Sequence, residues 1–413
     1  MPEIDGWTTA ELGKLVEIKI GGTPSRANNS YWADEYSVGF AWCSIADLKQ
    51  REVFRTKERI TDAGVAASNV KAIAAGTLLA SFKLSLGRMA IAGVDLYTNE
   101  AIAALVPREC AEDTRFLFHA LPSAFANVAA ETAVKGATLN LSSLSSLQFQ
   151  MPVSSAERSL IADILDAIDD SILSTETSIE KHEAIRVGLL DDLIAMPAKV
   201  GQSEAPDTLA DMVTSISSGC SVNADDRPPI AGELGVLKTS AVGGGRFQPH
   251  QSKAVWRKEV SRLKCPVTKG TIVFNRKNTP ELVGGSAYVA EDYPGLFLPD
   301  LLWSLQVEGE SDVDPEWVAT LMQTRPARAY VTRQATGTSK SMVNISQPLL
   351  LSMPLRKLPE RDQADAMKAV RSMQTEIDRL TSERTKLSWL RNGLRDDLLT
   401  GRRPVVPIRE AAE

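Results

Sequence analysis

Two short stretches combine basic, amide and hydroxyl side chains in a way that suits contact with nucleic acid. SFKLSLGRM places Lys83, Ser85 and Arg88 around Gly87, between two predicted strands. FNRKNTPE lies at the aligned point of the second half and carries Asn275, Arg276, Lys277 and Asn278. Arginine and lysine bind phosphates or guanine edges, and asparagine binds adenine edges. Each residue alone could equally be a solvated loop residue, but recurrence in both halves favours a pair of DNA-contacting loops.

Four further stretches add candidates with the same chemistry. GATLN and GTSKSMVN supply backbone N–H groups, hydroxyls and a lysine, which are common phosphate partners. GGGRF is interpreted mainly as a turn, and alternatively as a loop that approaches nucleic acid. GGTPSR, near the start of the chain, completes the set. The DNA-binding candidates in these four stretches are Thr23, Ser25, Arg26, Thr138, Asn140, Arg246, Thr338 and Lys340.

Catalytic signatures are missing from the sequence. There is no GxxxxGK[ST] phosphate loop and no [DN]PP[YF], the tetrapeptide with which amino-methyltransferases hold a base. The only D-x-K, at Asp47, is not interpreted as half of a nuclease motif. The three histidines are far apart, and the four cysteines form no CxxC, so a zinc site is not expected. We therefore predict a chain that is not an enzyme and binds neither a metal nor a cofactor.

Size and charge point to a multidomain protein with an acidic connector. A chain of 413 residues exceeds one compact core, and 43% hydrophobic residues is ordinary for a globular protein. No signal peptide or membrane-spanning run is recognisable, which predicts a cytoplasmic protein. The net charge is −6, but residues 151–206 alone hold 4 basic and 11 acidic side chains. The remaining segments can therefore still carry local basic patches.

The second half of the chain repeats the first. VGLLDDLIA, from Val187, returns within NGLRDDLLTGRRPVV, from Asn392, at an offset of 205 residues. FQMPVSSAER likewise returns as LSMPLRKLPER. A variable globular part is thus followed by a helical part, and then both recur. In the globular parts, GTLLASF, GTIVFN, RMAIAG and AYVAED predict strands, whereas DTRFLFHALPS and PEWVATLMQT predict short helices.

Both helical parts carry a heptad-like seam. The seam positions of the first part are Leu165, Ile168, Ile172, Thr175, Ile179, His182, Arg186, Leu189 and Leu193, and those of the second are Val370, Met373, Ile377, Leu380, Arg384, Leu387, Arg391, Leu394 and Leu398. Such spacing is typical of a coiled coil. Because polar residues interrupt the two seams at different positions, we expect the helices to pair with each other, antiparallel, within one chain. The fold class predicted is α+β: two α/β heads separated by two long antiparallel helices, with pseudo-twofold symmetry.

These stretches resemble a known family. LGKLVEIKIGGTPS, FAWCSIADLK, RITDAG, SLGRMAIAG and TNEAIAAL are similar to the target-recognition domain of type I restriction-modification specificity (S) subunits. MPVSSAERSLIADILDAIDDSI resembles their central spacer, and LRDDLLTGRRPV their terminus. The resemblance covers nearly the whole chain and is closer in the first half. It implies target-recognition domains at residues 1–153 and 201–356, a spacer helix at 154–200, and a second spacer helix with the tail at 357–413.

The resemblance also implies a function. Each head would read one half of a bipartite double-stranded DNA target, and the helices would set the gap and recruit two methyltransferase subunits and the restriction subunits. S-adenosylmethionine would belong to the methyltransferase, and ATP with magnesium to the restriction subunit. Two alternatives stay open. One is a specificity subunit of another methylation-based defence complex, and the other is a coiled-coil scaffold that does not bind DNA.

Overall fold

The chain forms two compact units in the computed structural model. Unit 1 comprises Met1–Glu176 and Ser382–Glu413, and unit 2 comprises Thr177–Thr381. The structure describes residues 5–34, 38–83, 85–109, 113–132, 139–195, 207–307, 313–339, 341–355 and 358–405. Two long helices, α5 (Ser155–Ala195) and α9 (Glu360–Leu398), contribute residues to both units.

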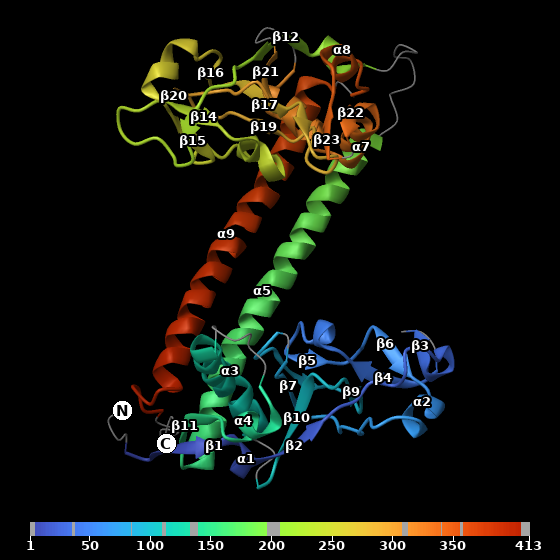
Figure 1. The fold of residues 1–413 in the computed structure, drawn as a ribbon. Helices are drawn as coiled ribbons and strands as arrows, with labels where there is room; N and C mark the ends of the chain where they lie inside the picture. Colours follow the sequence, from blue (N-terminus) through green and yellow to red (C-terminus); the bar gives the residue numbers. More distant parts are fainter. Residues whose placement is uncertain are drawn as a thin grey trace, which may run out of the picture. The chain divides into compact units, whose positions relative to one another are not determined.

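Unit 1 is built on three antiparallel or mixed sheets (Figure 1). The largest has the order β2 (Val16–Ile20), β10 (Ile102–Pro107), β7 (Leu78–Ser81), β8 (Met89–Ala92) and β5 (Glu52–Val53). The second has the order β3 (Trp32–Asp34), β6 (Glu58–Ile60), β4 (Phe40–Cys43) and β9 (Tyr97–Thr98), and a third pairs β1 (Trp7–Glu11) with β11 (Gln148–Pro152). Short helices complete the unit: α1 (Leu12–Leu15), α2 (Asp62–Ala66) and α4 (Leu141–Ser145).

The main core of unit 1 lies between the large sheet and helix α3 (Asp113–Thr132). Phe116, Leu121 and Phe125 of α3 are almost fully buried and pack with Leu78 and Leu105 of the sheet. The predicted short helix is therefore wrong in length, because α3 has 20 residues and runs through Pro122. Buried side chains continue on the same face beyond the proline, so packing outweighs the hydrogen bond that proline cannot donate.

Unit 2 repeats this plan. Its first sheet has the order β12 (Val213–Ser218), β21 (Leu302–Val307), β17 (Thr271–Asn275) and β19 (Ser286–Tyr288). Its second has the order β13 (Ala224–Asp225), β15 (Ser252–Val255), β14 (Gly235–Leu237), β20 (Tyr293–Phe297) and β16 (Pro266–Val267). A third contains β18 (Lys277–Asn278), β23 (Met342–Asn344) and β22 (Thr336–Ser339), and the helices are α6 (Pro315–Leu321), α7 (Arg325–Gln334) and α8 (Gln347–Leu351).

The strand orders confirm the duplication. The order β2-β10-β7-β8 in unit 1 matches β12-β21-β17-β19 in unit 2. The order β3-β6-β4-β9 matches β13-β15-β14-β20, and the last pair is parallel in both units. Two heads of the same mixed α/β topology therefore lie in one chain, as the sequence repeat predicts.

The long helices run antiparallel where they meet. In unit 1, Asp169 of α5 pairs with Arg391 of α9 at 2.9 Å, and Glu176 pairs with Arg384 at 3.7 Å. A higher residue number on α5 is therefore paired with a lower residue number on α9, which is the antiparallel arrangement. In unit 2, His182 of α5 lines one hollow with Glu376 of α9, and Arg186 lines another with Met367 and Val370.

The predicted seam faces inward on both helices. Its described side chains are buried or half-buried, with the single exception of Arg384. Leu165, Ile168, Val370, Ile377, Leu380 and Leu398 are the most deeply buried of them. The fold class is therefore confirmed as two α/β heads with two long antiparallel helices.

Candidate nucleic-acid interface

Two of the predicted stretches of unit 1 meet around Glu100. The Thr23 hydroxyl donates a hydrogen bond to the Glu100 carboxylate, and this bond is the main cause that lowers the pKa of Glu100. Burial opposes the shift, while the positive charges of Lys83 and Arg26 add to it. The structure therefore brings the GGTPSR stretch and the SFKLSLGRM stretch together, although about 60 residues separate them in the chain.

Arg26 is held in a fixed position on this surface. Its guanidinium forms two hydrogen bonds to the Glu58 carboxylate, one of them at 3.0 Å, and lies 3.6 Å from the ring centroid of Trp32. The indole nitrogen of Trp32 donates to the carbonyl of Ser25 at 3.1 Å. About half of the Arg26 side chain stays exposed. Arg26 thus already pairs with a carboxylate of the protein, as Arg246 of unit 2 also does, and only its exposed part, beside exposed hydroxyls, can donate to a phosphate group.

The SFKLSLGRM loop turns tightly before β8. Gly87 has φ +79°, and a Cβ there would lie 3.0 Å from the Cβ of Phe125, so glycine is required by both conformation and space. Lys83 and Ser85 are half-buried, and Arg88 is exposed. The backbone N–H of Arg88 donates to the Ser81 hydroxyl at 2.9 Å, which fixes the base of the loop while its guanidinium faces solvent.

Asn140 lies near the SFKLSLGRM loop, but its side chain stabilises the end of a helix. Its side-chain oxygen accepts a hydrogen bond from the backbone of Ser143 at 2.8 Å and so caps α4. The preceding residue, Leu139, donates to the carbonyl of Phe82 at 3.1 Å, which places this segment beside the SFKLSLGRM loop. Thr138 lies outside the described residues.

The candidate arginines of unit 2 are bound within the protein. Arg246 forms an ion pair with Asp378 of α9. Arg276 donates to the carbonyl of Asp300 at 2.8 Å and to the side chain of Asn344 at 3.3 Å. These contacts join the second head to α9 and the strand ends to one another. The sequence did not predict them, because the acceptors lie 24 to 132 residues away.

The other candidates of unit 2 are spread over β17, β18 and β22. Lys277 and Asn278 form β18 and are half-buried, and Thr338 belongs to β22. Lys340 lies outside the described residues. Asn275, at the end of β17, is only 2% exposed and lies in the wall of a pocket. A buried side chain cannot contact the edge of a DNA duplex, so this position is not part of an exposed reading surface.

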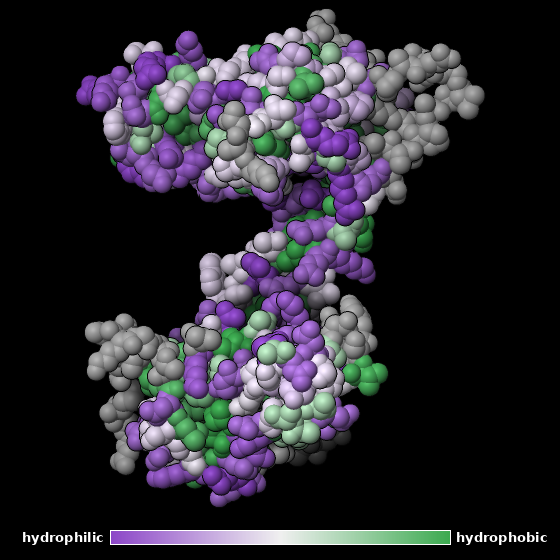
Figure 2. Space-filling view, turned by 45° about the vertical axis from the view of Figure 1, so that its right-hand side comes forward, coloured by the Kyte–Doolittle hydropathy of each residue, from purple (hydrophilic) through white to green (hydrophobic). Residues whose placement is uncertain are grey.

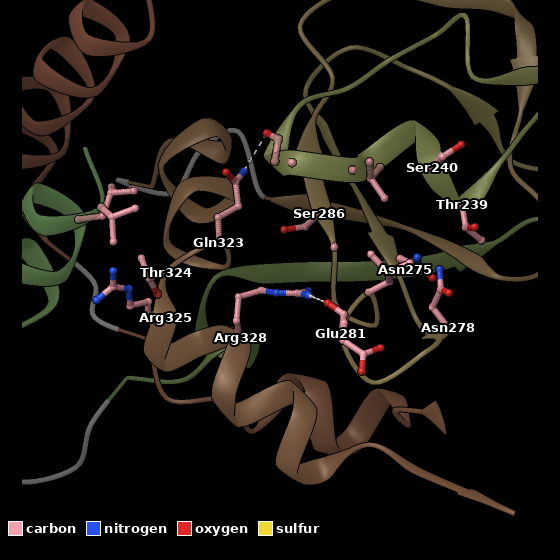
Figure 3. Close-up of a pocket in the computed structure, with 18 of the residues that line it drawn as sticks. Thr239, Ser240, Asn275, Asn278, Glu281, Ser286, Gln323, Thr324, Arg325 and Arg328 are labelled. Carbon is pink, nitrogen blue, oxygen red and sulfur yellow. Dashed lines mark hydrogen bonds between the residues drawn. The ribbon is translucent and has the colours of Figure 1, made fainter. Parts of the chain in front are cut away.

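The pocket beside Asn275 has a volume of about 550 Å³. Its walls come from the second half of α5, the glycine-rich segment Thr239–Gly245, the strand ends and α7 (Figure 3). Arg328 of α7 donates a hydrogen bond to the carbonyl of Glu281 at 3.0 Å. Burial lowers the pKa of Arg328, and no carboxylate of a described residue lies within 4 Å of its guanidinium.

Sequence reasoning missed this pocket because six separate elements and the loops between them build it. Neither Arg328 nor Ser286 stands in a motif, and each looks like an ordinary surface residue in the sequence. The only signal was the glycine run at Gly243, whose sequence mainly indicates a turn. The pocket therefore depends on tertiary structure alone.

The described residues hold no group of three His, Cys, Asp or Glu side chains placed to bind a metal ion. None of the helices, as far as the chain is described, is long and apolar enough to cross a membrane. The surface seen in Figure 2 is largely hydrophilic, with smaller hydrophobic areas between.

Duplicated mixed α/β heads on paired long helices can be compared with known proteins, and the comparison shows what this chain is similar to. Residues 4–183 match the family described as Type I restriction modification DNA specificity domain. The type I restriction enzyme MjaIX specificity subunit of Methanocaldococcus jannaschii is 24% identical over 189 residues. That alignment covers 44% of this chain and 42% of the relative, so the chain matches less than half of that relative's length.

Two solved structures share the fold over nearly the whole chain. The S subunit of a type I restriction-modification system from M. genitalium has a TM-score of 0.60 at 16% identity, covering 96% of both chains. A chain from a study of complex assembly and conformational transition of the type I R-M system has a TM-score of 0.54 at 13% identity, covering 97% of this chain and 99% of that one. Residues 4–183 are thus similar to the type I restriction modification DNA specificity domain, and nearly the whole chain shares the fold of these two solved structures.

Proposed function

We propose that this chain reads a bipartite DNA target, one half through each head, and positions catalytic subunits on it. The observation that carries the proposal is the duplicated topology, in which each head has the same strand order and its own contacts with the long helices. Two such heads suit two half-sites. In the first head, Thr23, Arg26 and Lys83 gather near Glu100, and the exposed Arg88 belongs to the same loop as Lys83, as suits a phosphate- or base-binding surface.

Exchange of the first head tests the two-reader model. Residues 1–150 would be replaced by the same region of a specificity subunit with another target. Mapping of modified adenines in a host that carries the complex should show one half-site changed and the other kept. A change in both half-sites would mean that the heads do not read independently.

The salt dependence of DNA binding tests the reading surface of the first head. Lys83→Ala with Arg88→Ala should weaken binding by the assembled complex and lower the log–log salt slope by about 1 for each phosphate that is no longer neutralised. The matched control is Lys14→Ala with Arg108→Ala. These exposed cations lie at the opposite end of β10, where Arg108 bonds to Leu15. Equal salt-dependence slopes for both double variants would mean that the SFKLSLGRM loop does not contact DNA.

Recruitment of partner proteins by the long helices is the second part of the proposal. Trp389 and Leu390 of α9 are 72% and 53% exposed, and Leu173 of α5 is 57% exposed. Large apolar side chains on an otherwise charged helix pair are suited to bind another protein. Trp389→Ser should therefore weaken co-purification of the methyltransferase subunit while DNA contacts stay intact, with Leu282→Ser, 57% exposed in unit 2, as the control.

Catalysis is assigned to the partners. We propose that the chain has no active site, that S-adenosylmethionine is bound by the methyltransferase subunits, and that ATP and magnesium are used by the restriction subunits. The purified chain should neither methylate nor cleave DNA with these cofactors present. Activity should appear only after the partner subunits are added, and activity of the chain alone would contradict the proposal.

A further inference from the structure

The pocket of unit 2 collects polar atoms that have no partner. Ten buried side-chain atoms among the described residues lack a hydrogen-bond partner, and five of them belong to side chains that line this one pocket. These atoms are Nε of Arg186, Oδ1 of Asp191, Oδ1 of Asn275, Oγ of Ser286 and Nη1 of Arg328. Buried polar groups are normally paired, and each unpaired one costs free energy. Such a concentration indicates a site whose ligand completes the hydrogen bonds.

One side of the pocket is suited to an anion. Arg186 of α5 and Arg328 of α7 have no carboxylate of a described residue within 4 Å, whereas Arg325 is 3.8 Å from Asp191. The N-terminus of α7, a helix of 10 residues whose N-cap position is Thr324, also lines the pocket. A helix N-terminus together with arginine side chains is a favourable environment for a phosphate group.

The other side carries two uncharged polar side chains, Ser286 and Asn275, together with the carboxylate of Glu281. Ser286 is 1% exposed and Asn275 is 2% exposed, and both are held by the strand-end hydrogen bonds of β17. The backbone N–H of Gly284 donates to the carbonyl of Asn275 at 2.8 Å, and a Cβ at Gly284 would lie 2.8 Å from Nη1 of Arg328. Gly284, two residues before Ser286, therefore lies close to both the Arg328 guanidinium and the backbone of Asn275. Figure 3 shows Arg328 reaching from α7 toward Glu281 of the same loop.

Apolar walls and size narrow the ligand further. Leu190, Val242 and Leu282 line the pocket, whose volume of about 550 Å³ falls within the range of small-molecule sites. An asparagine amide pairs naturally with the N6/N7 edge of adenine. The arginine side chains suit a phosphate, the buried Asn275 amide suits a base, and the apolar walls suit the faces of that base. We therefore propose that this pocket binds a free mononucleotide with its phosphate at the α7 N-terminus. The inference goes beyond the proposed DNA reading, which does not use this pocket.

Calorimetric titration of the full chain with adenosine 5′-monophosphate tests the site. Saturable binding of one equivalent is expected, and adenosine and inorganic phosphate should each bind at least tenfold more weakly. Phosphate binding as tightly as the nucleotide would overturn the nucleotide assignment, and no saturable binding up to millimolar concentration would overturn the site itself.

Variants locate the binding. Arg328→Gln should weaken nucleotide binding about ten- to hundredfold, since it removes a charge-assisted hydrogen bond. Arg333→Gln, an exposed arginine on the same helix, should leave it unchanged. Because Arg328→Gln could disturb folding, Ser286→Ala is the second variant. It removes an unpartnered hydroxyl, so it should keep the melting temperature of the free chain and still weaken binding severalfold. Unchanged affinity in both pocket variants would place the nucleotide elsewhere and overturn the proposal.

A competition experiment separates a free nucleotide from one that is part of DNA. A short duplex should not displace adenosine 5′-monophosphate from the chain. Displacement would mean that DNA occupies the pocket, which contradicts the proposal while leaving the proposed reading function intact. Loss of DNA binding in the Lys83 and Arg88 variant, by contrast, bears only on the reading function.

Discussion

In both units an ion pair joins a helix of the head to a long helix at equivalent positions. The head helix carries the positive charge in unit 1 and the negative charge in unit 2. In unit 1, Arg115 of α3 bonds to Asp163 at 2.8 Å and also to Asp166, both on α5. In unit 2, Glu316 of α6 bonds to Arg371 of α9. Arg115 lies two residues after the aspartate that is the first residue of α3, and Glu316 lies two residues after the aspartate that is the N-cap of α6. Asp166 and Arg371 are 205 residues apart. The duplicated contact has thus been kept while its polarity was reversed.

Burial differs between the two contacts. The Asp166 side chain is 12% exposed and also meets His119 at 2.8 Å and Arg51 at 3.2 Å. Arg371 is 56% exposed and has only Glu316 and, at 3.8 Å, Asp314 as ion-pair partners among the described residues. Opposite polarity makes each head helix complementary to its own long helix and repulsive toward the other. The deeper contact in unit 1 should therefore be the more important for stability.

Removal of the buried carboxylate should have the largest effect. Asp166→Ala leaves Arg51, Arg115 and His119 without their shared partner, which should lower the free energy of unfolding by about 3 kcal/mol. Asp163→Ala is the control, since this carboxylate also binds Arg115 but is 57% exposed, and its loss should cost less than about 1 kcal/mol. Urea denaturation would measure both, and equal losses would refute the greater weight given to the buried contact.

The same cluster predicts sensitivity to acid. Burial raises the pKa of Asp166, but the hydrogen bonds from His119 and Arg115 outweigh it, so the pKa is lowered overall. A carboxyl group with a lowered folded-state pKa stabilises the protein above its unfolded pKa of about 3.9, and this stability disappears as the pH falls through the folded value. Below about pH 4, the stability of wild type and Asp166→Ala should therefore converge.

Reversal of one charge in unit 2 should have a moderate effect. Glu316→Arg opposes Arg371 with a like charge and should cost about 1 kcal/mol, since the Arg371 partner is 56% exposed. Adding Arg371→Glu restores an ion pair of the polarity found in unit 1, and at least half of the loss should return, with Asp314 limiting the recovery. No recovery in the double variant would show that side-chain packing rather than charge determines this contact.

Ion pairs between the long helices should contribute less. A double-mutant cycle on Asp169 and Arg391, which are 21% and 30% exposed and 2.9 Å apart, should give a coupling of about 0.5–1 kcal/mol. The pair of Glu176 and Arg384 is 3.7 Å apart and about 45% exposed, so its coupling should be close to zero. A larger coupling for the exposed pair would contradict this ranking.

Thiol reactivity should distinguish the units without any effect on stability. Burial, with a smaller contribution from the charge of Asp47, raises the pKa of Cys43 in unit 1 to about 12. At pH 8 this thiol should resist iodoacetamide, whereas the half-buried Cys220 of unit 2 should be alkylated. Peptide mapping by mass spectrometry would measure the rates, and labelling of Cys43 as fast as Cys220 would contradict its burial.

Periodicity and repetition in the sequence determined most of the architecture. The seam from Leu165 to Leu398 predicted two long antiparallel helices, because heptad spacing over many turns requires a continuous apolar partner. The aligned stretches GTLLASF and GTIVFN predicted a strand at the same place in each half. A short apolar run opened by glycine can be recognised from the sequence alone, because it depends only on neighbouring residues. The helix from Asp113 was predicted too short, since only packing against the sheet compensates for Pro122.

Tertiary structure alone decided which polar residues face solvent. The sequence favours Asn275 and Arg276 as DNA contacts as strongly as Arg88, and Arg246 less strongly, because side-chain type is all that a loop sequence reveals. In the fold, Asn275 lies in a pocket wall, while Arg276 and Arg246 bind acceptors of the protein itself. Hydrogen-bond partners and burial arise from contacts between distant segments. The gathering of Thr23, Arg26 and Lys83 around Glu100, and of Arg328 with Ser286, therefore follows from the folded chain and not from local sequence.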